Sequence, residues 1–304
     1  MEKPLRVYDS ILDLFSSEDN PTPLVRVNKL NPFRNVQLYA KLEWYNPFGT
    51  VKDRVALHML LEAEKKGLTP DKKLLEPTSG NMGIGLAAVA NLKGYRLMTP
   101  LASSASQEKK KILRLLGSEI EEYEETPLKD GGIRLAKEKL RKHPDKYHML
   151  NQYANEANTE AHYMTTGPEI WKQTGGKLTH LIAGLGTCGT IRGAGRFLKE
   201  KNPDIKVIGV HPEENHRIPG VRSIRQLSAT NFFNPDEYDG LVEVKTQEAN
   251  ELCLRLNREE GIIAGPSSAM ALAGAFKALE DQPACAVIIF PDDISRYKLP
   301  DSGK

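Results

Sequence analysis

The stretch that decides the fold is "THLIAGLGTCGTIRGAGRFLKEKNPDIKVIGV", residues 179–210. A short apolar run leads through a glycine-rich loop into a segment with helical spacing of apolar residues, and a second β-branched run follows. Strand, loop, helix and strand in this order are typical of a parallel sheet that is covered by helices. The stretch therefore predicts an α/β fold.

The same alternation recurs along the rest of the chain. Further strands are expected in "VQLYAKLE" (36–43), "KKLLEP" (72–77), "YRLMTPLA" (95–102), "EIEEYEE" (119–125) and "ACAVIIFPDD" (284–293). Strands that alternate with amphipathic helices predict open, mostly parallel sheets with helices on both faces. Because ligands bind such sheets at the carboxyl ends of the strands, the informative residues should lie in the strand-to-helix loops.

The composition is that of an ordinary globular protein. Among 304 residues, 42 Lys and Arg face 40 Asp and Glu, so bulk charge favours neither a nucleic acid nor a membrane as partner. No apolar run approaches the length of a membrane span and the first residues lack the apolar core of a signal peptide, so we expect a cytoplasmic protein. The three cysteines, Cys188, Cys253 and Cys285, have no metal-ligand spacing and indicate neither a disulfide framework nor a metal site.

The glycine loop of residues 184–190 has the composition of a phosphate-binding site. Gly184, Gly186 and Gly189 let backbone N–H groups converge on an anion at a helix N-terminus, where threonine hydroxyls can donate as well. The Gly184-x-Gly186-x-x-Gly189 spacing also fits an NAD-type oxidoreductase, with Glu213 after the next strand as the partner of a ribose. The threonines favour a phosphate monoester.

"NPFGTVKDR", residues 46–54, places Lys52 in the first turn of an expected helix. Thr50 and Asp53 form a Thr-x-x-Asp capping pattern, so the helix should start at Thr50. The positive end of the helix dipole disfavours an ammonium there. A lysine with a lowered pKa is a candidate nucleophile because only the neutral amine attacks a carbonyl, and a solvated surface lysine is the alternative.

Two further loops place small polar residues at expected helix starts. "EPTSGNMGIG" offers Thr78, Ser79 and Asn81 to a small carboxylate, and "AGPSSAMALA" offers Ser267. Helix capping is the alternative for both loops. One cofactor needs an amine, a cradle for a phosphate monoester and a polar contact for a ring nitrogen, and that cofactor is pyridoxal 5'-phosphate (PLP).

Five motifs, in the same order, resemble those of the cysteine synthase group, a branch of the tryptophan-synthase β-subunit-like (fold type II) PLP enzymes. They are "NPFGTVKDR", "EPTSGNMGIGLA", "NQYANEANTEAHYMTTGPEIW", "GLGTCGTIRGAGRFLKEKNPDIKVIGV" and "AGPSSAMALA". The similarity runs from "NPTPLVRV" near the start to "PDDISRY" near the end. It covers nearly the whole chain.

The resemblance implies a role for each matching residue. Lys52 is the catalytic lysine that forms a Schiff base with PLP, Asn81 contacts the ring hydroxyl and Ser267 contacts the ring nitrogen. The implied phosphate loop consists of Gly186, Thr187, Cys188, Gly189 and Thr190. The implied substrate-binding residues are Thr78, Ser79, Asn81, Met82 and Gln152. The chain departs from the family at Met82, where threonine is common, and at Cys188, where glycine is common.

The resemblance also implies the architecture. The expected fold is two open, mostly parallel α/β domains with the PLP site in the cleft between them, usually in a homodimer. The smaller domain spans residues 41–147. The larger, PLP-phosphate-binding domain combines residues 1–40 and 148–304.

The implied reaction is PLP-dependent β-replacement, which makes L-cysteine from an activated serine and sulfide through an aminoacrylate intermediate. A neutral hydroxyl at Ser267 does not hold a proton on the ring nitrogen, so a long-lived carbanion is disfavoured and β-elimination is favoured. Serine or threonine dehydratase and cystathionine β-synthase share the first half of this reaction and remain alternatives. A non-catalytic binder on the same fold is a third.

The leaving group is predicted from "HPEENHRIPGVRSIRQL", residues 211–227, which carries His216, Arg217, Arg222 and Arg225. A dianionic phosphate is best matched by a bidentate arginine, whereas an acetyl ester needs no charge. "IPGVRS" resembles the stretch that holds the phosphate-recognising arginine in O-phosphoserine-using cysteine synthases. The resemblance implies that Arg222 binds O-phosphoserine, alongside use of O-acetylserine, and a solvated basic loop is the alternative.

Overall fold

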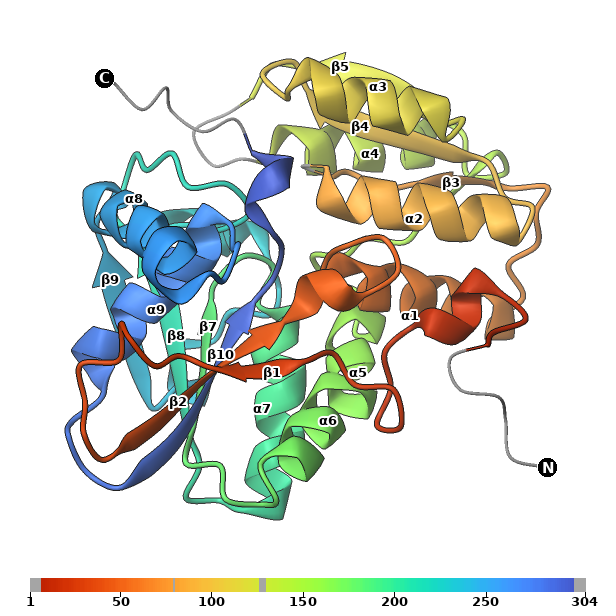
Figure 1. Cartoon of the computed structure of the whole chain (residues 1–304). Coiled ribbons are helices and arrows are strands. Elements are labelled where there is room, and N and C mark those ends of the chain that lie inside the picture. The colour runs from red at the N-terminus through yellow and green to blue at the C-terminus, as the bar shows by residue number, and fades with distance from the viewer. Residues whose placement is uncertain (1–6, 79, 126–129, 298–304) are drawn as a thin grey trace, which may run out of the picture.

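The computed structural model describes residues 7–78, 80–125 and 130–297 and contains two sheets (Figure 1). The larger sheet has the order β1 (Leu24–Arg26), β2 (Val36–Leu42), β10 (Ala284–Phe290), β7 (His180–Gly184), β8 (Lys206–Pro212), β9 (Gly240–Val244). The smaller sheet has the order β5 (Glu119–Tyr123), β4 (Leu97–Ala102), β3 (Lys73–Leu75), β6 (Tyr147–Met149). All neighbouring strands are parallel except β1 and β2. The predicted α/β class is confirmed.

The larger sheet is buried on both faces. Because side chains alternate along a strand, Ala286 and Ile288 of β10 face one apolar core and Val287 and Ile289 face another. The first core contains helices α8 (Thr246–Arg255) and α9 (Pro266–Ala278), and the second contains α6 (Thr166–Gln173) and α7 (Gly189–Lys201). Burial on both faces explains why the sequence of β10 is a continuous apolar run.

Helix α1 (Lys52–Lys65) lies where the two halves of the molecule meet (Figure 1). Its Val55 and Met59 share one apolar core with Leu86 of α2 (Asn81–Leu92) and Ala161 of α5 (Ala157–Met164). Two further helices, α3 (Gln107–Leu115) and α4 (Gly131–Lys142), pack on the smaller sheet. None of the helices in the described part of the chain has the length and apolar character needed to cross a bilayer.

The start of α1 differs by two residues from the sequence prediction, since the helix begins at Lys52 and not at Thr50. The predicted capping pair joins the first turn of the helix to the loop before it. Thr50 Oγ1 accepts the N–H of Lys52 at 3.1 Å, and the carboxylate of Asp53 accepts the Thr50 hydroxyl at 3.0 Å and the N–H of Phe48 at 2.7 Å. These bonds fix the loop that delivers Lys52.

The chain leaves the larger sheet after β2, builds the smaller sheet, and returns after β6 to complete the larger one. This path explains why the sequence contains no linker. The predicted domain boundaries, at 40/41 and 147/148, fall inside β2 and β6. The division into two domains at these residues stays a prediction.

Helices α5 and α7 approach closely at Gly193, which suggests a test of the packing. A Cβ atom there would lie 2.1 Å from the carbonyl oxygen of Thr159, whereas a Cβ at Gly195 of the same helix would lie 3.2 Å from a Val207 methyl group. We expect Gly193→Ala to lower the free energy of unfolding by roughly 1–3 kcal/mol because backbone cannot yield. The matched Gly195→Ala should be near neutral, since a methyl group can shift and alanine favours helices.

Urea denaturation of the parent protein and of both variants measures the two effects. Equal stabilities of the two variants would contradict this account of the contact between α5 and α7.

Candidate functional site

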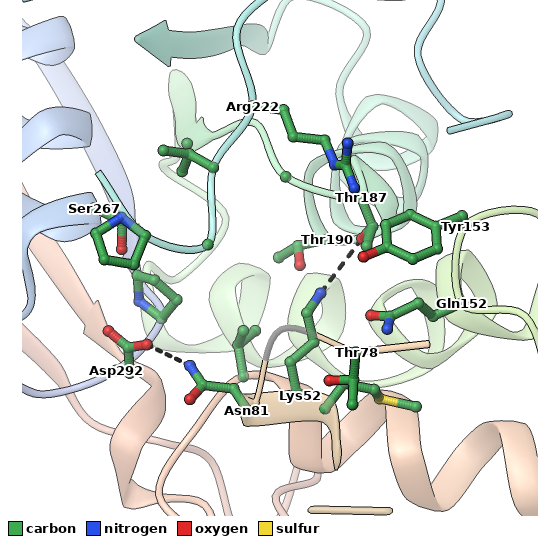
Figure 2. Close-up of a pocket in the computed structure, with 18 of the residues that line it drawn as sticks. Lys52, Thr78, Asn81, Gln152, Tyr153, Thr187, Thr190, Arg222, Ser267 and Asp292 are labelled. Atoms are coloured by element: carbon green, nitrogen blue, oxygen red, sulfur yellow. Dashed lines mark hydrogen bonds between the residues drawn. The ribbon is translucent and has the colours of Figure 1, made fainter. Parts of the chain in front are cut away.

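The loops that follow strands of both sheets converge on one cleft of about 260 Å³ (Figure 2). Lys52 follows β2, Thr78 follows β3, Gln152 follows β6, Thr187 follows β7, Arg222 follows β8 and Asp292 follows β10. This confirms the expectation that the carboxyl ends of the strands gather the informative residues.

Most of the predicted site residues line this cleft. They are Lys52, Thr78, Asn81, Met82, Gln152, Gly186, Thr187, Cys188, Thr190, Arg222 and Ser267. Gly189 lies in the same loop, at the first position of α7, and Ser79 lies outside the described residues.

The amine of Lys52 points into the cleft, where its Nζ donates to Thr187 Oγ1 at 3.3 Å (Figure 2). Removal of the ammonium from water by the surrounding protein lowers the pKa of Lys52 to about 8. The direction of this shift agrees with the sequence argument. The largest cause of the lowered pKa is burial, whereas the sequence suggested the helix dipole as the cause. A substantial neutral fraction near physiological pH makes Lys52 a competent nucleophile.

The backbone of the glycine loop packs so closely against neighbouring atoms that Gly186 and Gly189 have no room for a side chain. A Cβ at Gly186 would lie 2.5 Å from the Gly220 carbonyl oxygen, and a Cβ at Gly189 would lie 2.1 Å from the Asn158 amide. Cys188 adopts φ 68°, the left-handed conformation that favours glycine. Cys188 thus keeps a glycine-like backbone despite its side chain, at the N-terminus of α7 where free N–H groups can bind an anion.

The hydroxyl of Thr187 lies where three donors meet at the edge of the cleft. Its oxygen is within hydrogen-bond distance of Lys52 Nζ, of Asn158 Nδ2 at 3.2 Å and of the Gly189 N–H at 3.3 Å. Thr190 Oγ1 lies 3.1 Å from His162 Nε2. Burial holds the pKa of His162 well below its usual value, so this ring is neutral.

The opposite wall carries a buried acceptor without a partner. Asn81 Nδ2 donates to Asp292 Oδ2 at 2.6 Å (Figure 2), while Asn81 Oδ1 has no hydrogen-bond partner among the residues that the structure describes. A buried polar atom left without a partner is satisfied by a bound group with a donor, such as a ring hydroxyl. Ser267, in the first turn of α9, lines the same cleft.

The predicted substrate loops are tied to each other beneath the cleft. Gln152 Nε2 donates to the carbonyl of Pro77 at 2.9 Å, and the Gln152 N–H donates to Glu76 Oε1 at 3.0 Å. Thr78 Oγ1 accepts the N–H of Gly83 at 3.0 Å and so caps α2. Burial raises the pKa of Glu76 to about 7. Sequence reasoning missed this carboxyl group.

In the basic loop after β8, all of which the structure describes, Arg217 and Arg225 are exposed and Arg222 is buried. The guanidinium carbon of Arg222 lies 5.1 Å from the centre of the Tyr153 ring, and Nη1 donates to the Gln226 carbonyl at 3.3 Å. Arg222 is thus the arginine that the loop turns toward the cleft.

Several lining residues were missed in the sequence. Two of them could have been found: Tyr153 stands inside the "NQYANEAN" motif, and Asp292 stands at the end of an expected strand. Lys109 stands among three consecutive lysines and Tyr123 among glutamates, so neither pattern distinguishes them from solvated residues.

The amine, the tight glycine loop with its hydroxyls and the unsatisfied acceptor of Asn81 together fit PLP. The family model described as "Pyridoxal-phosphate dependent enzyme" matches residues 15–292. The chain belongs to this family of PLP-dependent enzymes. Because the matching family is one of PLP-dependent enzymes, the NAD-type alternative is wrong. Glu213, the residue that a dinucleotide would require, accepts the N–H of Thr246 at the start of α8 at 2.7 Å.

Known members of this PLP family include close relatives of the chain. Cysteine synthase B of Escherichia coli is 40% identical over 278 residues, which cover 91% of each chain. A cysteine synthase structure from Entamoeba histolytica superposes with a TM-score of 0.87 at 30% identity and covers 100% of this chain and 95% of the other. A hydrogen sulfide-producing enzyme from Fusobacterium nucleatum gives 0.86 at 32% identity, with 96% and 100% covered.

The pKa of Lys52 predicts how its reactivity depends on pH. In the cofactor-free protein, carbamylation of Lys52 by cyanate should rise with pH through a midpoint near 8, because the neutral fraction of the amine rises there. An ordinary lysine has its midpoint near 10.4. Peptide mass spectrometry after brief treatment at each pH measures the rate, and a midpoint above pH 10 would contradict the lowered pKa.

Proposed function

We propose that the protein is a cysteine synthase, which makes L-cysteine and releases the leaving group of an activated serine by β-replacement with sulfide. The observation that carries this proposal is the amine of Lys52, held with a lowered pKa against the glycine loop. The cysteine synthases among its relatives support the choice of reaction within the family.

The chemistry divides between cofactor and protein. Bound PLP supplies an aldehyde for a covalent link to an amine and a conjugated ring that accepts electrons. Lys52 Nζ would hold the cofactor and would take the α-proton of the substrate as general base. The loop of residues 186–190 holds the phosphate, Asn81 the ring hydroxyl and Ser267 the ring nitrogen.

The substrate carboxylate is assigned to the loops that Glu76 ties together. Thr78 and Gln152 offer hydroxyl and amide donors before α2 and after β6, and Ser79, which is assigned to the same role, lies outside the described residues. Met82 is 2% exposed and packs in the core, so it contributes apolar surface where a threonine would offer a hydroxyl.

The neutral hydroxyl of Ser267 favours loss of a β-substituent over a long-lived carbanion. This supports β-replacement and also fits the two alternatives, a serine or threonine dehydratase and a cystathionine β-synthase. The three activities differ in what enters after the leaving group departs.

A product assay separates these activities. O-acetylserine and O-phosphoserine are each supplied with sulfide, with homocysteine, or with neither, and the products are identified by mass spectrometry. We expect L-cysteine with sulfide and little pyruvate without it. Pyruvate as the main product under all conditions would establish a dehydratase, and preference for homocysteine a cystathionine β-synthase.

O-phosphoserine is proposed as a substrate alongside O-acetylserine. The support is Arg222, which is 7% exposed, lines the cleft and stacks on Tyr153. Burial of a guanidinium beside the substrate strengthens its attraction for a dianionic phosphate, which an acetyl ester does not need.

Arg222→Ala tests this assignment. Loss of a charge-assisted contact weakens binding by about 1.5–3 kcal/mol, so kcat/KM for O-phosphoserine should fall roughly tenfold or more while that for O-acetylserine is spared. An exposed arginine of the same loop gives the control: Arg217→Ala should leave both values unchanged. Equal losses of kcat/KM on both substrates, or a parent protein that is inactive with O-phosphoserine, would contradict the assignment of Arg222.

We also propose that the enzyme acts as a homodimer in the cytoplasm, as its resemblance to cysteine synthases implies. A solution mass of twice the chain mass of 33.9 kDa is the expected value.

A further inference from the structure

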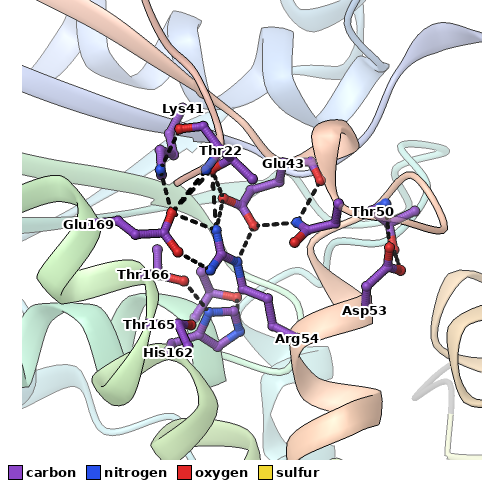
Figure 3. Close-up of polar contacts among 12 residues, drawn as sticks. Thr22, Lys41, Glu43, Thr50, Asp53, Arg54, His162, Thr165, Thr166 and Glu169 are labelled. Carbon is purple, nitrogen blue, oxygen red and sulfur yellow. Dashed lines mark hydrogen bonds and ion pairs between the residues drawn. The ribbon is translucent and has the colours of Figure 1, made fainter. Parts of the chain in front are cut away.

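Four ionisable side chains lie together around Arg54 of α1 (Figure 3). Arg54 of α1 pairs with Glu43 and Glu169, and Lys41 pairs with Glu169, so the ion cluster holds two cations and two anions. Their side chains are between 0% and 1% exposed. Sequence reasoning did not find this cluster, and the proposed reaction does not use it.

Arg54 is the centre of this ion cluster. Its Nε and Nη2 donate to the two oxygens of Glu43 at 2.7 and 2.9 Å, and Nη2 also donates to Glu169 Oε2 at 2.9 Å. Nη1 donates to the other oxygen of Glu169. The planar guanidinium therefore holds two carboxylates at once, which requires the directional geometry of an arginine.

The carboxylates are themselves fixed by other segments. Glu43 Oε1 accepts the Thr22 hydroxyl at 2.8 Å, and Glu169 Oε2 accepts from Lys41 Nζ at 2.6 Å. Burial alone would raise the pKa of Glu43, but the charge of Arg54 lowers it to about 2, so this carboxylate stays ionised. Arg54 thus ties α1 to the N-terminal segment, to the turn that follows β2 and to α6.

Lys52 and Arg54 act on opposite sides of the same helical turn. Two residues correspond to about 200° of rotation around a helix, so Lys52 faces the cleft while Arg54 faces the ion cluster. The apolar contacts of α1 with α2 and α5 are non-directional and permit small rotations of the helix. The hydrogen bonds of Arg54 are directional and restrict the rotation that would move Nζ of Lys52.

We propose that Arg54 is a positioning residue for Lys52: by holding Glu43 and Glu169 it sets the rotation of α1 and so the place of the reactive amine. The inference rests on the proposed role of Lys52. The competing explanation is that Arg54 only balances buried negative charge and thereby stabilises the fold.

A double variant separates the two explanations. Arg54→Met with Glu43→Gln removes one cation and one anion, which leaves the pair of Lys41 and Glu169 intact. Replacement of buried ion pairs by apolar groups is often neutral or stabilising, so the fold should persist. The directional link between α1 and the turn that follows β2 is lost.

The control removes an arginine with the same bonding pattern on the surface. Arg255 of α8 donates from Nε and Nη2 to the two oxygens of Glu259 at 2.8 and 3.2 Å and is exposed. Arg255→Met therefore deletes a bidentate pair far from α1.

The measurements on the cofactor-loaded proteins are kcat and KM, thermal unfolding, and the visible absorption band of the link between Lys52 and the cofactor. For the double variant we expect kcat to fall roughly 100-fold, the effect of a displacement of about 1 Å in a reacting group, with KM and the unfolding temperature near those of the parent and a changed absorption band. Arg255→Met should match the parent in all four.

A double variant with the kcat and absorption band of the parent would overturn the proposal. If it does not fold, Arg54→Lys decides by the same readouts, because a point charge cannot replace the two-sided contacts and kcat should still fall at least about tenfold. Arg54→Lys with unchanged kcat would overturn the proposal too. If the parent protein has no cysteine synthase activity, only the proposed function is refuted. The absorption band of the link between Lys52 and the cofactor then still tests the positioning role of Arg54.

Discussion

The buried pairing of Arg54 with Glu43 and Glu169 is the interaction on which the rest of the arrangement depends. It joins residues that are 11 and 115 positions apart and fixes α1 at the junction of the two halves of the molecule. Removing one member of such a pair leaves an uncompensated buried charge and costs about 3–5 kcal/mol. Arg54, Glu43 and Glu169 therefore act as a unit. Three consecutive residues of α1 have different tasks: Lys52 points into the cleft, Asp53 bonds to the loop before the helix, and Arg54 forms the ion cluster.

The parallel sheets explain why the site forms where it does. In parallel strands all carboxyl ends lie at one edge, so loops that follow six strands deliver their residues to one cleft. Helix α7, which begins after one of these loops, and helix α9 direct the N–H groups of their first turns toward the same space. A cleft that collects positive partial charge in this way suits an anionic cofactor.

Much of the fold and of the cleft could be predicted from the sequence, because strand and helix periods and glycine loops are local signals. Three strands were missed, β1, β6 and β9. They are short strands at sheet edges and are only partly buried, so they lack the continuous apolar run of the central strands. The ion cluster could not be found because nothing local pairs Glu43, Arg54 and Glu169. The basic loop carried three arginines, and only the tertiary structure distinguishes the buried Arg222 from its exposed neighbours.

The central claim is that the amine of Lys52 carries the cofactor. Borohydride reduction of the cofactor-loaded protein makes the link permanent, and peptide mapping by mass spectrometry then locates the pyridoxyl group. The account predicts that this group is on Lys52 and that Lys52→Ala leaves no reducible link. A pyridoxyl group on another lysine of the parent protein would contradict the account.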